Sequence, residues 1–207
     1  MFNKNVRELT KADLDRLIAE QAEEDQFLEF KADVPSDGKS RSSGWNPVKG
    51  LQSFGRDRLM EELAAFANAF GGEIVLGMSE TSEKPHRAGK ITPLPAVHDL
   101  ADRLRDTIKD TIEPPILQSA VQVIATGDDE GVIVLGVAPS TRGPHRVKTT
   151  LKVPVRREKS CDSMSMSEII ERARGANRIP PQRERAIRAA VMLKTDIHRI
   201  LARNGTA

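Results

Sequence analysis

The chain has 207 residues, of which 38% are hydrophobic, and a formal net charge of +2. This length fits one domain with appendages, and the hydrophobic content is sufficient for one core. No apolar run approaches the ~20 residues of a membrane span, so a membrane-spanning protein is excluded. The single cysteine, Cys161, forms no internal disulfide and no cysteine-rich zinc site. Together with a polar N-terminal segment that lacks a signal-peptide core, these features indicate a cytoplasmic protein without a membrane partner.

The first part of the chain alternates between helix and strand patterns. We expect the N-terminal segment 1–22 to form a helix, whose start signal is Thr10. An alternating strand follows at 27–31. The segment 33–57 is rich in Gly, Ser and Pro and predicts a long loop insertion. A helix over 58–70 ends at Gly71 and Gly72, which suit a helix C-cap, and an apolar strand buried on both faces follows at 73–78.

The second part continues with a polar connection at 79–92 and a helix over 97–112. Strands at 118–125 and 132–138, joined by a turn, precede an edge strand at 153–157 and a short helix at 167–173. The order predicts an α+β (mixed α/β) fold in which helices flank a central mixed sheet. We expect the main domain at 23–175 and a C-terminal amphipathic helix at 180–207. This helix packs on its own domain, binds nucleic acid or mediates dimerisation, and packing is the default.

Carboxylates gather near the first two strands. Glu29 lies in an apolar stretch, Glu24 precedes it by five residues, and Glu80 follows the apolar strand. If the three converge, their hard oxygen ligands suit Mg²⁺ or Mn²⁺, which activates water for phosphodiester cleavage. The alternative is that each carboxylate is solvated. Lys31 shares a strand face with Glu29, where it contacts a phosphate or forms an ion pair with Glu29.

The charge is divided unevenly along the chain. Residues 1–141 hold 16 Lys+Arg and 24 Asp+Glu, a net of −8, whereas residues 142–207 hold 16 and 6, a net of +10. The segment 142–159 is the densest part and predicts contacts with a phosphate backbone, the alternative being a solvated edge strand. Its basic residues are Arg142, Arg146, Lys148, Lys152, Arg156, Arg157 and Lys159. Because aromatic residues are scarce, structured nucleic acid is favoured over single strands.

Three isolated residues each allow two interpretations. Trp45 either stacks on a base or packs its loop against the domain, and packing is the commoner role. Asn68 is either functional or caps the end of its helix, and capping is favoured. His145 either takes part in acid–base chemistry or is a polar surface residue, and the surface role is favoured.

Residues 24–31 and 65–78, read together, resemble the Alba-like domain of the Schlafen family, a nucleic-acid-binding module. In RNA-cutting Schlafen proteins the site is a Glu, a second Glu five residues on in a Glu-Phe-Lys motif, and an Asp just after the strand that follows Gly-Gly. The resemblance implies that Glu24, Glu29 and Glu80 hold the metal and that Lys31 assists. The third position departs from the family, which commonly has two aspartates where this chain has Ser79 and Glu80. The resemblance extends over about 24–171, and the 33–57 insertion is longer than the family leads us to expect.

Three functional hypotheses follow. The first is a metal-dependent endoribonuclease acting on structured RNA such as transfer RNA. The second is a non-catalytic regulator that binds DNA or RNA, and the third is an assembly module that uses the last helix. A homodimer is also expected, because vertebrate Schlafen cores pair two related lobes around a groove and one copy of this chain would supply one lobe.

Overall fold

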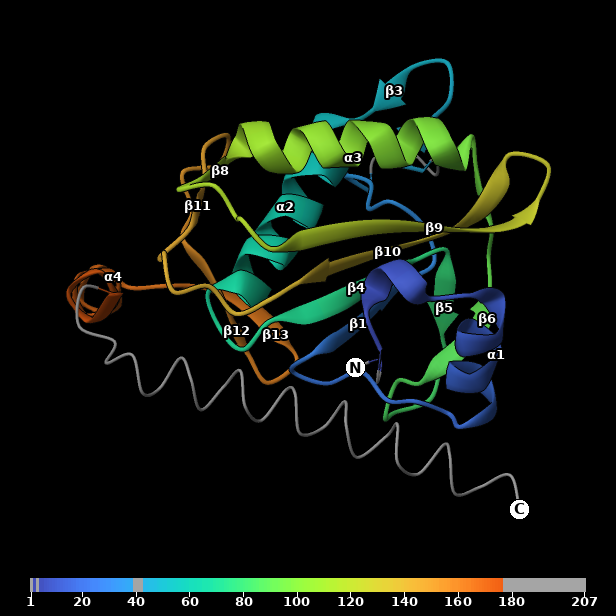
Figure 1. The fold of residues 1–207 in the computed structure, drawn as a ribbon, viewed down its shortest axis with the longest axis horizontal. Coiled ribbons are helices and arrows are strands. Elements are labelled where there is room, and N and C mark those ends of the chain that lie inside the picture. The colour runs from blue at the N-terminus through green and yellow to red at the C-terminus, as the bar shows by residue number, and fades with distance from the viewer. Residues whose placement is uncertain (1, 3, 39–42, 177–207) are drawn as a thin grey trace.

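A computed structural model describes residues 2, 4–38 and 43–176 of the chain. Its centre is a five-stranded mixed sheet in the order β1-β4-β10-β7, with β9 on the other edge of β10 (Figure 1). β1 and β4 are parallel, and the remaining pairs of this sheet are antiparallel. The strands are β1 (Leu28–Lys31), β4 (Gly72–Leu76), β7 (Leu94–Pro95), β9 (Ser119–Gly127) and β10 (Glu130–Val137). The predicted α+β fold with a mixed sheet is confirmed.

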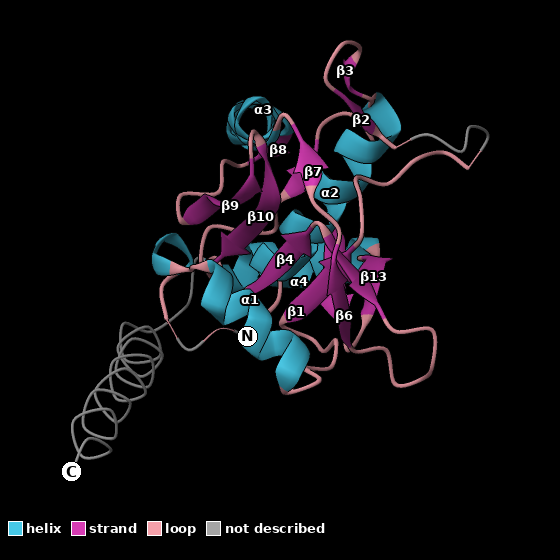
Figure 2. Ribbon diagram, turned by 90° about the vertical axis from the view of Figure 1, so that its right-hand side faces the viewer, coloured by secondary structure: helices cyan, strands magenta, loops and turns pink. Residues whose placement is uncertain are grey.

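Helices cover both faces of this sheet (Figure 2). α2 (Ser53–Ala67) and α3 (Val97–Thr111) pack on one face around a core that includes Leu59, Leu63 and Leu104. The 3-10 helix η1 (Val6–Glu8) and α1 (Lys11–Ala19) cover the other face, where a second core includes Phe30 and Val134. Because both faces are covered, β4 is buried along its whole length, as its apolar sequence predicts.

Local sequence explains where the helices begin and end. The carboxylate of Asp13 accepts hydrogen bonds from the amide and hydroxyl of Thr10 at 2.9 and 2.8 Å, which closes the first turn of α1. After the C-terminal end of α2, the amide of Gly71 donates to the carbonyl of Phe66 at 2.9 Å. Gly71 has a φ of +77°, a conformation that costs little only for glycine, so it makes the turn from α2 into β4. The helix itself ends earlier than predicted, at Ala67 with Asn68 as its C-cap.

Four two-stranded ribbons lie around the central sheet. β12 (Pro154–Arg157) pairs with β13 (Ser160–Ser163) and packs on α2, next to β1. The others join β2 (Trp45–Asn46) to β3 (Gly50–Leu51), β5 (Met78–Glu80) to β6 (Ala88–Ile91), and β8 (Ile112–Glu113) to β11 (Arg146–Val147). α4 (Met166–Ala176) ends the described part of the chain, and none of the helices described is long and apolar enough to cross a membrane.

Differences from the predicted elements lie mainly in the loops. The expected loop insertion contains the β2–β3 ribbon, and α2 begins at Ser53, within that insertion. The expected polar connection at 79–92 contains most of the β5–β6 ribbon. Short ribbons carry too few alternating residues to be recognised from periodicity. Four residues of the insertion, 39–42, and the predicted C-terminal helix lie outside the described residues.

Candidate functional site

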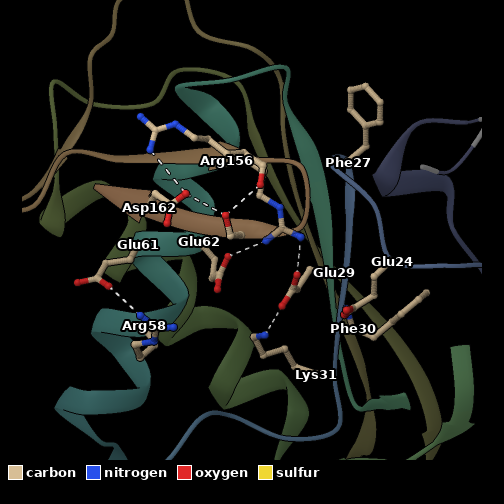
Figure 3. Close-up of polar contacts among 12 residues, drawn as sticks. Glu24, Phe27, Glu29, Phe30, Lys31, Arg58, Glu61, Glu62, Arg156 and Asp162 are labelled. Atoms are coloured by element: carbon tan, nitrogen blue, oxygen red, sulfur yellow. Dashed lines mark hydrogen bonds and ion pairs between the residues drawn. The ribbon is translucent and has the colours of Figure 1, made fainter. Parts of the chain in front are cut away.

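Charged side chains, mostly buried, form a cluster where β1, α2 and β12 meet (Figure 3). We call this cluster of Glu24, Glu29, Lys31, Glu62 and Arg156 the acidic pocket. Glu29 on β1 is 8% exposed and forms ion pairs with two cations. Its Oε2 lies 2.6 Å from Nη2 of Arg156, and its Oε1 is paired with the ammonium of Lys31 on the same strand. The ion-pair alternative for Lys31 is therefore what the structure shows, and both oxygens of the Glu29 carboxylate are engaged.

The guanidinium of Arg156 lies at the centre of this pocket. Its Nη1 donates to Oε2 of Glu62 at 3.1 Å, and its Nη2 donates also to the carbonyl of Asp25 at 3.1 Å. The guanidinium carbon lies 4.8 Å from the ring centre of Phe66, within cation–π distance. Arg156 is only 4% exposed, so, contrary to expectation, it does not lie on the basic surface with the other six residues of its segment.

Glu62 is the site residue that sequence reasoning missed. It is 5% exposed, and burial together with the nearby charge of Glu29 raises the pKa of its carboxyl. A signal was present, because Glu62 follows Leu59 by three residues and precedes Phe66 by four. That spacing puts a carboxylate on the apolar stripe of α2, where an unpaired charge is costly.

Glu24 lies in the irregular segment before β1, outside the regular strand, as it must to approach Glu29. Its Oε1 accepts a hydrogen bond from the amide of Phe30 at 2.8 Å. Burial raises the pKa of Glu24 to about 7, against the effect of this hydrogen bond, and repulsion from Glu29 and Glu80 adds to the rise. The three predicted carboxylates are thus close enough to influence one another, although Glu24 has no contact with Arg156.

Glu80, at the end of β5, lies at the exposed rim. Its Oε2 is 3.4 Å from Nδ1 of His86 on the turn between β5 and β6. The side chain of Glu80 is 33% exposed, whereas that of Glu29 is 10% exposed. The three predicted carboxylates therefore differ: Glu29 is buried and ion-paired, Glu24 is buried and hydrogen-bonded to the amide of Phe30, and Glu80 is partly exposed.

The arrangement does not fit a preformed metal centre. Among the described residues, no group of three or more His, Cys, Asp or Glu is placed to hold a metal ion. The geometry gives the reason, because Lys31 and Arg156 occupy the Glu29 carboxylate and Phe30 engages that of Glu24. The Mg²⁺ or Mn²⁺ cofactor stays a prediction.

The remaining basic residues of 142–159 are exposed, but they differ in their partners. Three form ion pairs: Arg146 with Glu113, Lys152 with Glu61, and Arg157 with Asp162 and Glu168. Arg142, Lys148 and Lys159 have no carboxylate within ion-pair distance in the described part of the chain. These three are the free cations of the segment.

Asn68 and His145 hold this segment against α2. The amide of Asn68 donates to the carbonyls of His145 and Pro154, both at 2.8 Å, and its Oδ1 accepts from the amide of His145 at 2.7 Å. His145 is 0% exposed and donates through Nδ1 to the carbonyl of Pro114 at 2.6 Å. The favoured surface role for His145 is therefore wrong, and Asn68 joins two segments in addition to lying at the end of its helix.

Trp45 packs the insertion against the domain. Its side chain is part of the core beside α3, its Nε1 donates to the carbonyl of Pro95 at 2.7 Å, and Arg103 lies 5.8 Å from the ring centre. At 3% exposure the ring offers no face to a nucleic-acid base. The packing interpretation of Trp45 is confirmed.

Fold and site together define an α+β domain in which a buried acidic pocket lies beside a basic surface segment. A family model described as Schlafen, AlbA_2 matches residues 24–165. The chain belongs to this family, as the motifs at 24–31 and 65–78 predict. No curated protein matches the chain significantly in sequence.

Two solved structures resemble the domain at a distance. The DIP2311 protein from Corynebacterium diphtheriae is 21% identical with a TM-score of 0.49, over 73% of this chain and 28% of that protein. The chain therefore spans little more than a quarter of that structure. The N-terminal domain of a RecG-related protein from Nitrosomonas europaea is 19% identical with a TM-score of 0.46, over 79% of this chain and 94% of that domain.

Proposed function

We propose that the chain is a nucleic-acid-binding domain that contacts the phosphate backbone through the exposed basic residues of 142–159. The observation that carries this proposal is the set of free cations in this segment, Arg142, Lys148 and Lys159. Free surface cations exchange only water and counterions when a phosphate binds, so their binding releases counterions at little cost. Membership of the Schlafen family supports the same class of ligand.

The paired residues of the segment add to this capacity. Arg146, Lys152 and Arg157 lie on the surface, where an ion pair contributes about 0–1 kcal/mol. Such pairs are weak enough to open when a phosphate competes for the guanidinium or ammonium group. Among the described aromatic residues Trp45 is buried and only Phe54 and Phe70 are exposed, which favours contacts to a duplex or folded RNA over base stacking.

Salt-dependent binding tests this proposal. Fluorescence anisotropy would follow a labelled RNA hairpin and a labelled DNA duplex over a series of salt concentrations. We would replace Arg142, Lys148 and Lys159 together with Gln. The plot of the logarithm of the association constant against log salt for the DNA duplex should then become less steep by about 2–3, because each lost phosphate contact removes about 0.9 from its slope. A preference for the hairpin would support the structured-RNA prediction.

A matched control replaces three exposed cations outside the segment, Lys11, Arg16 and Lys109, with Gln. The control changes the net charge by the same amount, so it should lower affinity only slightly and leave the slope nearly unchanged. If the control weakens binding as much as the test variant, binding does not depend on 142–159. Absence of binding to either nucleic acid at low salt would also contradict the proposal.

A second candidate function is the predicted endoribonuclease acting on structured RNA such as transfer RNA. It is favoured by the proximity of Glu24, Glu29 and Lys31 in one pocket. Incubating the protein with total transfer RNA in Mg²⁺, Mn²⁺ or EDTA, beside a Glu29→Ala variant, tests it. Cleavage that needs metal and Glu29 supports the nuclease, whereas binding without cleavage restricts the function to binding.

The predicted homodimer has a separate test. One lobe binds less nucleic-acid surface than two lobes arranged around a groove, so dimerisation would increase affinity. Light scattering at several protein concentrations measures the mass directly, and a monomeric mass with and without the RNA hairpin would contradict the dimer.

A further inference from the structure

The polar groups of the acidic pocket balance one another without a metal. Two buried carboxylates, Glu29 and Glu62, face two cations, Lys31 and Arg156, so the charges of these four residues sum to zero. The carboxylate of Glu24 lies outside this set and is held by the amide of Phe30. Arg156 bridges both carboxylates, with Nη2 2.6 Å from Oε2 of Glu29 and Nη1 3.1 Å from Oε2 of Glu62. Because each of these four charges already has an opposite charge beside it, the electrostatic demand of Glu29 and Glu62 for a further cation is low.

The placement of Arg156 is enforced from several directions. Phe66 covers the guanidinium, the carbonyl of Asp25 accepts a third hydrogen bond, and only 1% of the Arg156 side chain is exposed. Its Nε is buried and has no hydrogen-bond partner among the described residues. Leaving the pocket would separate the guanidinium from two carboxylates, one carbonyl and the ring of Phe66, which would be costly.

We infer that Arg156 is the resident cation of the acidic pocket, and that it binds Glu29 and Glu62 in place of a divalent metal. Arginine contact and metal binding at Glu29 are therefore mutually exclusive in this chain. This inference does not rest on nucleic-acid binding, which uses other residues of the 142–159 segment.

The physical argument concerns the oxygens of Glu29. Both oxygens of Glu29 already lie against a cation, Oε1 against Lys31 and Oε2 against Arg156, so a metal that coordinates this carboxylate directly at about 2.0–2.1 Å competes with them for its negative charge. A metal next to Arg156 would also face a like charge in a poorly solvated site, which is costly. Removing the guanidinium would leave Glu29 and Glu62 with Lys31 alone, and the excess negative charge would then attract a divalent cation.

The test compares Mn²⁺ binding to the wild-type chain and to Arg156→Met, which keeps an apolar stem of similar length. Isothermal titration with Mn²⁺ alone and thermal unfolding with and without Mn²⁺ are the two measurements. We expect no saturable Mn²⁺ binding by the wild type. We expect at least a tenfold higher affinity in Arg156→Met, with Tm rising by about 5–10 °C when Mn²⁺ exceeds its Kd about a hundredfold.

Arg157→Met is the matched control, because Arg157 neighbours Arg156 but lies on the surface with 44% of its side chain exposed. It should bind no more Mn²⁺ than the wild type. Adding Glu29→Gln to Arg156→Met should abolish the gained binding, which assigns the metal to this pocket.

Two results would overturn the inference. One is a folded Arg156→Met protein, judged by its circular dichroism, that gains no Mn²⁺ affinity. The other needs no Arg156 variant: stoichiometric Mn²⁺ binding by the wild type that Glu29→Gln removes. The second result would leave the nucleic-acid-binding proposal untouched, because that proposal is measured by the salt slope of the surface residues.

Discussion

Asn68 shows how one side chain joins segments that are distant in the sequence. Its amide group satisfies the amide and carbonyl of His145 and the carbonyl of Pro154, and the residue is 3% exposed. These backbone groups are buried, so they cannot recover the lost hydrogen bonds from water. Asn68 therefore fixes the path of the chain into β12, where Arg156 reaches the acidic pocket.

Replacing Asn68 with Ala should lower the free energy of unfolding by about 2–4 kcal/mol, because three backbone groups lose their partner. Urea unfolding followed by circular dichroism measures this change. Asn46→Ala is the control, since Asn46 accepts two hydrogen bonds in an exposed turn and should cost less than about 1 kcal/mol. Equal costs for the two variants would contradict the joining role of Asn68.

His145 makes stability depend on pH. Burial lowers the pKa of this histidine below its ordinary 6.5, and the charge of Arg142 adds to the effect, although the hydrogen bond to Pro114 opposes it. The unfolded chain therefore binds a proton more readily than the folded one. The contribution of neutral His145 is complete above pH 6.5 and is lost as the pH falls through 6.5 toward the lower folded value.

We expect the urea midpoint to fall further, or to rise less, between pH 7.5 and pH 5 in the wild type than in His145→Gln, which has no proton to gain. Glu24, whose pKa is raised to about 7, acts in the opposite direction in both proteins, so the comparison isolates His145. The exposed His98 supplies the control variant, His98→Gln, whose profile should follow the wild type. If His145→Gln and the wild type lose the same stability on acidification, another group causes the pH dependence.

At the scale of elements, the β2–β3 ribbon shows how an insertion becomes part of the domain. Trp45 contributes its ring to the core beside α3, whereas Val48, in the turn of the same ribbon, is 94% exposed. One anchored residue is enough to hold a short ribbon, because its own two strands bury too little surface to be stable alone.

Trp45→Ala should lower the free energy of unfolding by about 3–5 kcal/mol, as expected for an aromatic ring removed from a core. Val48→Ala, in the same ribbon, should change it by less than about 0.5 kcal/mol. Trp45 is the only tryptophan, so intrinsic fluorescence reports on it alone. Its emission should not change when nucleic acid binds, and a quenched emission would instead support stacking on a base.

At the scale of the whole molecule, the central sheet connects two cores. Leu63 and Trp45 belong to the core on the α2–α3 face, and Phe30 and Val134 to the core on the α1 face. Both cores use side chains of β4 and β10, which point alternately to the two faces. The cores therefore share their backbone hydrogen bonds and should unfold together.

Phe30→Ala tests this coupling from the side opposite Trp45. It should destabilise the chain by about 3–5 kcal/mol and shift the transitions seen by tryptophan fluorescence and by circular dichroism to the same urea concentration. Leu117→Ala is the control, because Leu117 is 67% exposed. Transitions that separate in Phe30→Ala would show that the two cores unfold independently.

Elements with local sequence signals are predicted correctly from the sequence. The capping residues Thr10 and Asp13, the apolar run of β4 and the glycine at 71 each act within a few residues, so their patterns predict structure directly. The motifs at 24–31 and 65–78 also led to the family. The density of basic residues identifies the segment 142–159, but it does not tell that Arg156 is buried while the other six are exposed.

The construction of the acidic pocket, in contrast, depends on tertiary contacts that the sequence does not reveal. Arg156 is 127 residues from Glu29 and 94 from Glu62, and no local pattern tells which carboxylate a distant arginine will meet. Burial of His145 and the links from Asn68 likewise depend on packing between distant segments. The fold decides which buried charges lie close together. Because a buried charge without an opposite charge beside it is costly, each one pairs with whichever opposite charge the fold brings near.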